Sequence, residues 1–175
     1  MQNDVTRLKD EDCRRLGAVL DLEDKNYRRL LRLAWRQNSY MQRQDVGRLE
    51  ANAQEWARYL PEANEARIAR ERFVGQLAGQ RGLTIPPDKV EDLLDYTDPY
   101  TKKIVSGALN SVRRVAAKLA RQNELNRLLA EFCLDLVHEE AEIFTSSVLE
   151  DPAGCYDKEA QNTGRGPGGV IVRQA

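Results

Sequence analysis

Aromatic residues and long apolar runs are scarce in this sequence. Only 6% of the 175 residues are Phe, Trp or Tyr, whereas 31% are charged. A compact two-layer domain usually has more aromatic residues in its core, so the composition favours long helices that each bury one stripe and solvate the rest. No apolar run approaches the roughly 18 residues that a membrane-spanning helix needs. We therefore expect an all-α protein that does not insert into a membrane.

Cysteine and excess positive charge are scarce as well. The three cysteines, Cys13, Cys133 and Cys155, match neither a disulfide framework nor the ligand spacing of a zinc site. The first twelve residues lack the hydrophobic core of a secretory signal. The net charge is −1 and the isoelectric point is near 6.0, which differs from the basic footprint of nucleic-acid-binding proteins. These observations predict a cytoplasmic protein with no nucleic-acid partner.

Enzyme motifs are also missing. His138 is the one histidine and pairs with Asp135 on a single helix face, whereas di-metal bundles need two such sets. The consecutive carboxylates Glu139, Glu140 and Glu142 point in several directions, as expected of a solvated face. The glycines around Pro167 lack the Gly-Lys-Ser/Thr of a phosphate-binding loop. We expect no catalytic residue, metal or cofactor.

Two long helices are predicted first. Apolar residues recur every three or four positions over residues 12–44, which is typical of one amphipathic helix. Asp45 is an N-cap candidate for a second helix that continues to about Gly82. Pro61 lies within this second stretch, so we expect a kink or a brief break there.

A third long helix follows a short one. Residues 84–87 form a connector, and residues 88–96 can form a short helix. Asp98 followed by Pro99 is a strong signal for the start of a helix. No proline follows until Pro152, which leaves room for about 50 helical residues in a helix about 75 Å long. We predict an elongated antiparallel bundle or coiled coil of three long helices with a short cap helix over residues 1–151. Residues 152–175 are predicted to be a Gly-rich C-terminal tail.

The seam of the third long helix contains two polar residues, Asn123 and Asn126. A buried polar pair at such positions can fix the register of packed helices if its hydrogen bonds are satisfied. The alternative is a local widening of the bundle in which both side chains contact water. The sequence leaves both interpretations open.

The end of this helix is richer in apolar residues than one stripe requires. Either the short helix and the tail fold over it, or it forms an exposed groove that accepts an amphipathic helix of another protein. Its charge is polarised: residues 96–130 contain seven Lys or Arg and two acidic residues, whereas residues 131–175 contain nine acidic and three basic ones. This pattern can match the neighbouring helices or attract a charged partner. The apolar residues are Leu125, Leu128, Leu129, Phe132, Leu136, Ile143, Phe144 and Leu149.

The order of these features resembles the FlgN family of flagellar export chaperones over about residues 16–156. The leucines from Leu16 to Leu31, the Asp45 break and the Gly82-Leu83 turn are similar to the first two helices of that family. The stretch Asn123-Glu124-Leu125-Asn126 resembles the family's Asn-x-x-Asn pattern within the long last helix. Tyr156-Asp157 looks like the start of the family's tail.

The resemblance implies a function. Such chaperones bind the C-terminal segments of hook-associated (hook–filament junction) proteins in the cytoplasm and deliver them to the flagellar type III export apparatus. Our hypothesis places the client on residues 125–149 and the tail, and a contact with the export-gate platform at Tyr156. The alternative for Tyr156 is that it packs the tail onto the bundle.

Two other functions fit the residues. A self-associating coiled-coil scaffold predicts a stable homodimer and no client. A helical nucleic-acid-binding protein would use Arg28, Arg29, Arg32 and Arg36 together with the basic part of the last long helix, although acidic residues are interleaved along the first helix.

Overall fold

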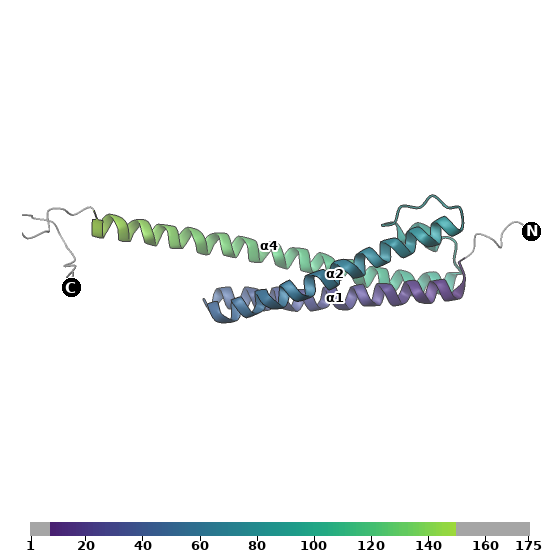
Figure 1. Ribbon diagram of the computed structural model, residues 1–175, viewed down its shortest axis with the longest axis horizontal. Coiled ribbons are helices and arrows are strands. Elements are labelled where there is room, and N and C mark those ends of the chain that lie inside the picture. Colours follow the sequence, from purple (N-terminus) through teal and green to yellow (C-terminus); the bar gives the residue numbers. More distant parts are fainter. Residues whose placement is uncertain (1–7, 150–175) are drawn as a thin grey trace, which may run out of the picture. The chain divides into compact units, whose positions relative to one another are not determined.

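Four helices make up the part of the chain that the structure describes. The computed structural model describes residues 8–149, with side chains described as far as residue 146. The helices are α1 (Asp10–Gln42), α2 (Val46–Gln80), α3 (Val90–Leu94) and α4 (Pro99–Leu149), and no strand occurs within this range (Figure 1). The prediction of an all-α helical bundle is confirmed. The chain divides into two compact units, Met1–Arg127 and Leu128–Ala175.

In the first unit, α1 and α2 form an antiparallel pair. Arg81 near the end of α2 forms an ion pair with Asp12 near the start of α1, at 2.7 Å. At the opposite ends, Asn52 donates a hydrogen bond to the Leu33 carbonyl. The connecting turn ends at Asp45, whose carboxylate accepts a hydrogen bond of 3.1 Å from the Arg48 amide. Asp45 is therefore the N-cap that the sequence predicts.

Pro61 does not break α2, which runs without interruption from Val46 to Gln80. Of the kink or brief break that the sequence predicts, the break does not occur. Trp56 precedes the proline and Ala63 follows it, and both pack into one cluster with Leu30 and Ala34 of α1. This shared packing on both sides of Pro61 stabilises the helical path despite the missing amide donor.

A glycine closes α2. Gly82 has a φ of +65°, which glycine adopts without the steric cost of a side chain. The Gly82 amide donates to the Gly79 carbonyl and the Leu83 amide donates to the Ala78 carbonyl, at 3.1 and 2.9 Å. This pattern is a Schellman motif. It turns the chain so that Leu83 packs against the core.

Asp98 starts α4 as predicted. One of its carboxylate oxygens accepts hydrogen bonds of 3.0 Å from the amides of Tyr100 and Thr101. Hydrogen bonding from Thr101, through its side chain and its amide, lowers the pKa of Asp98. Pro99 occupies the first helical position, where no amide donor is needed.

Within the first unit, α4 runs parallel to α1. Ser111 of α4 donates a hydrogen bond of 2.8 Å to Asp24 of α1, and Asn126 further along α4 bonds to Ala34 further along α1. The residues of α4 that are buried in this unit follow helical spacing. They are Val105, Leu109, Val112, Val115, Leu119 and Asn126.

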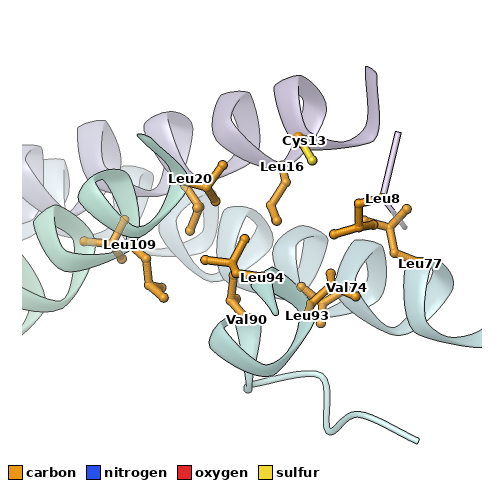
Figure 2. Close-up of a cluster of buried hydrophobic side chains, with 12 residues drawn as sticks. Leu8, Cys13, Leu16, Leu20, Val74, Leu77, Val90, Leu93, Leu94 and Leu109 are labelled. Carbon is orange, nitrogen blue, oxygen red and sulfur yellow. The ribbon is translucent and has the colours of Figure 1, made fainter. Parts of the chain in front are cut away.

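The core of the first unit has two hydrophobic clusters. The first joins the start of α1 and the end of α2 to α3 and the start of α4 (Figure 2). The second joins the later part of α1 to the earlier part of α2 and to Val115 and Leu119. Tyr27 packs against both clusters. One turn away, the buried Glu23 carboxylate accepts a hydrogen bond of 2.7 Å from Arg70. Burial and the neighbouring Glu23 raise the pKa of Tyr27.

Candidate functional site

The second unit exposes large apolar side chains on α4. Phe132 is 59% exposed, Leu136 42%, and both Ile143 and Phe144 66%. Surface patches of this kind usually mark sites of interaction with other molecules. Residues 128–146 of α4 are called the acidic segment below, because their charges are all negative.

Most exposed apolar residues of the acidic segment lie on two sides of the helix, and Leu134, which is 59% exposed, lies beyond the second. Leu128, Phe132, Leu136 and Ile143 are spaced by four or seven residues, which places them on one face. Val137 and Phe144 also differ by seven residues and lie about 100° around the helix from that face. An amphipathic partner helix can therefore contact either face, or two helices can contact both.

Other predicted contact residues have different environments. Leu125 belongs to the first unit and is 48% exposed, as is Leu128 of the second. Leu129 is half-buried. The side chain of Leu149, the tail over residues 152–175 and Tyr156 lie outside the described residues.

The short helix does not provide the cover that the sequence allowed for these residues. The three apolar side chains of α3, Val90, Leu93 and Leu94, are almost completely buried in the first cluster. They are therefore already used in the core of the first unit.

Negative charge surrounds the apolar faces of the acidic segment. It carries five carboxylates and no Lys or Arg. Within the described part of the chain, Asp135, Glu139, Glu140 and Glu142 form no ion pair with a basic side chain. His138 and Glu142 line a shallow depression with Thr145, and no group of three metal-ligating side chains occurs among the described residues.

The two asparagines of the predicted seam differ. Asn126 is 4% exposed, and its amide donates to the Ala34 carbonyl at 2.8 Å and to the Gln37 side chain at 3.0 Å. Its oxygen accepts hydrogen bonds from Asn38 and from Gln122, both at 3.0 Å. The polar group is fully satisfied, as a role in register requires.

Asn123 is exposed and does not share this buried position. The placement of both asparagines in one seam is therefore wrong. A helix of 3.6 residues per turn rotates residues three apart by about 300°, and here this rotation carries Asn123 past the edge of the buried stripe.

Three of the four arginines considered for nucleic-acid binding form ion pairs with carboxylates of the protein, whereas Arg32 forms none within the described residues. Arg28 pairs with Asp24, Arg29 with Glu62 at 3.2 Å, and Arg36 with Glu55 at 3.6 Å. The Arg29 guanidinium also lies 4.2 Å from the centre of the Tyr59 ring. Since their charges are locally balanced, these side chains do not form a concentrated basic surface for phosphates.

The comparison with protein families decides the identity. A family model described as "FlgN protein" matches residues 14–164. This chain belongs to the FlgN family. Membership implies that it is a flagellar export chaperone, a class of proteins that bind flagellar proteins and are not enzymes.

Other comparisons add little to this assignment. Neither curated proteins nor solved structures match the FlgN-family chain. Among the helices within the described residues, none has the length and apolar character needed to cross a membrane.

Proposed function

We propose that this FlgN-family chain binds the C-terminal helical segments of hook-associated proteins in the cytoplasm and delivers them to the flagellar type III export apparatus. The single observation that supports this proposal most is the exposed apolar surface of the acidic segment. A chaperone needs such a surface, because its clients carry amphipathic helices that would otherwise associate prematurely.

The energetics suit a reversible complex. Complete burial of one side chain such as Phe132 or Ile143 contributes about 1.5–3 kcal/mol. A client helix with apolar residues at positions i, i+4 and i+7 can contact three or four of these side chains at once. Part of the gain is offset by the entropy lost on association, so the complex can be stable and still dissociate at the export gate.

Charge selects the kind of helix that fits. A client with Lys or Arg beside its apolar face would pair with Asp135, Glu139 and Glu142, whereas an acidic client would be repelled. The same argument weighs against the self-associating scaffold. Two acidic segments brought together would place carboxylates against carboxylates with no basic residue from either.

The tail completes the proposal. Tyr156 is assigned a contact with the export-gate platform, and residues 152–175 a share of the client contact, from the family resemblance alone. The Tyr156→Ala variant should keep its affinity for the client and lose affinity for the platform. An unchanged affinity for the platform would remove Tyr156 from the proposal.

The decisive experiment is co-purification with hook-associated C-terminal segments encoded by the same genome, followed by sizing. Phe132→Asp should abolish the complex. Leu22→Asp is a matched control, because Leu22 is 52% exposed and lies on α1, outside the acidic segment. A wild-type homodimer without any client complex would favour the scaffold instead. Equal loss in both variants would place the client elsewhere.

A further inference from the structure

A second open surface lies in the first unit, between the starts of α1 and α4. It is a groove of about 830 Å³. It shares no residue with the acidic segment. The wall residues that matter are Cys13, Gly17 and Ala18 of α1 and Tyr100, Thr101 and Ile104 of α4.

Small side chains open the α1 wall of the groove. Gly17 has space around it, since a Cβ added there would meet nothing within 4 Å. Ala18 adds only a methyl group beside it. Small residues let another helix approach closely, which increases the number of contacts along the line of approach.

The α4 wall of the groove is apolar and exposed. Tyr100 is 75% exposed and Ile104 is 54% exposed, although both belong to a helix whose opposite face is in the core. Tyrosine gives a large contact area at low entropic cost, and Tyr is enriched at the centre of protein interfaces. These two side chains give the groove an apolar contact that its small residues alone would not.

The rim of the groove is acidic. Asp10, Asp21 and Asp98 line it, against one basic residue, Arg14. Within the described residues, none of the three carboxylates forms an ion pair with a Lys or Arg side chain. A cationic partner would therefore find three carboxylates without a basic partner in the bundle, although Asp98 also caps α4.

The groove has a definite length. One turn beyond Asp21, the side chains of Asp24 and Arg28 hydrogen-bond to Ser111 across α1 and α4. From Asp10 to Asp21, α1 rises about 16 Å, which corresponds to three turns of a helix.

We propose that this groove binds a short amphipathic helix, of about three turns, from a different protein. One face of that helix is apolar and its edges carry Lys or Arg. A second copy of this chain is disfavoured, because symmetric pairing would bring two acidic rims together. The proposal goes beyond the proposed function, since it adds a docking surface separate from the client site.

Two synthetic 12-residue peptides test the proposal. They share one Leu/Ala face and carry either lysines or glutamates at its edges. Binding is measured by fluorescence anisotropy with the full chain carrying Phe132→Asp, because lysines also suit the acidic segment. The lysine peptide should bind at least tenfold more tightly than the glutamate peptide, and high salt should remove the difference.

Gly17→Gln tests the location. A Cβ at Gly17 meets nothing within 4 Å, so a glutamine side chain can extend into the open groove, and replacing a glycine within a helix favours folding. The variant should melt at the same or a higher temperature and bind the lysine peptide at least tenfold more weakly. Gly79→Gln is the matched control: Gly79 lies on α2, also has open space around it, and should leave binding unchanged.

Several results would overturn the proposal. They are no binding of the lysine peptide, equal binding of both peptides, or unchanged binding in Gly17→Gln. Tighter binding after deletion of residues 2–7 would show that the chain's own N-terminus fills the groove. A homodimer that Gly17→Gln dissociates would show that the occupant is a second copy. If the peptide results hold while no hook-associated segment binds, the groove stands and the client proposal fails.

Discussion

Asn126 makes the strongest test of how α4 is held on α1. Asn126→Ala removes four hydrogen bonds that link α4 to Ala34, Gln37, Asn38 and its own Gln122. Each such bond contributes about 0.5–1.5 kcal/mol net. Three of the partners are half-buried side chains that can bind water instead, whereas the Ala34 carbonyl is fully buried. We therefore expect a loss of about 2 kcal/mol.

Asn123→Ala is the control, because Asn123 lies three residues away on the same helix and is exposed. Both changes improve helix propensity by the same amount, so the difference between the variants isolates the buried hydrogen bonds. In urea unfolding followed by circular dichroism, a slope of about 2 kcal/mol per molar converts the difference to about 1 M in midpoint.

A difference below about 0.5 kcal/mol between the two variants would refute this reasoning, since surface substitutions already vary by that amount. A second change, Asn126→Leu, separates stability from specificity. If Asn126 fixes the register, Asn126→Leu should be about as stable as the wild type but should show a mixture of oligomers on sizing.

Three further predictions follow from the first unit. Glu23→Ala should destabilise the first unit by about 1.5–3 kcal/mol, because the largely buried Arg70 loses its 2.7 Å ion pair and keeps only the 3.7 Å contact with Glu71. The double change of Glu23 and Arg70 to leucine should recover most of the loss in urea unfolding. Burial, followed by nearby acidic residues, raises the pKa of the Cys13 thiol above its ordinary 9.0. The stability of the wild type should therefore fall as pH rises above about 9, and that of Cys13→Ala should fall less. Identical pH profiles for the two proteins would contradict this. The pKa of Asp98 is lowered from 3.8 by its capping bonds, so its contribution is present above that pH and is lost in acid. Asp98→Ala should lower the urea midpoint at pH 7 but not at pH 2.

Much of the architecture follows from local rules. Apolar spacing predicted α1, α2 and α4, and the caps at Asp45 and Asp98 and the turn at Gly82 were predicted from residue type. These features depend on backbone chemistry within a few residues, so a sequence reveals them. The family resemblance, confirmed by the match to residues 14–164, added the role as an export chaperone.

Other features depended on contacts between distant residues. Pro61 stays within a continuous helix because the packing of Trp56 and Ala63 against α1 outweighs its local preference. The burial of Asn126 but not Asn123 depends on the rotation of α4 against α1, which a spacing pattern fixes only to within about one residue.

The sequence by itself determined which residues form helices, where those helices begin and end, and that their last long helix carries surplus apolar and acidic residues. Only the tertiary structure decided that α3 is used in the core, that Arg29 and Arg36 of α1 pair with carboxylates of α2, and that a groove opens between Gly17 and Ile104. The reason is physical. Helix formation is governed by neighbours in the chain, whereas burial and exposure depend on which surfaces of separate helices meet.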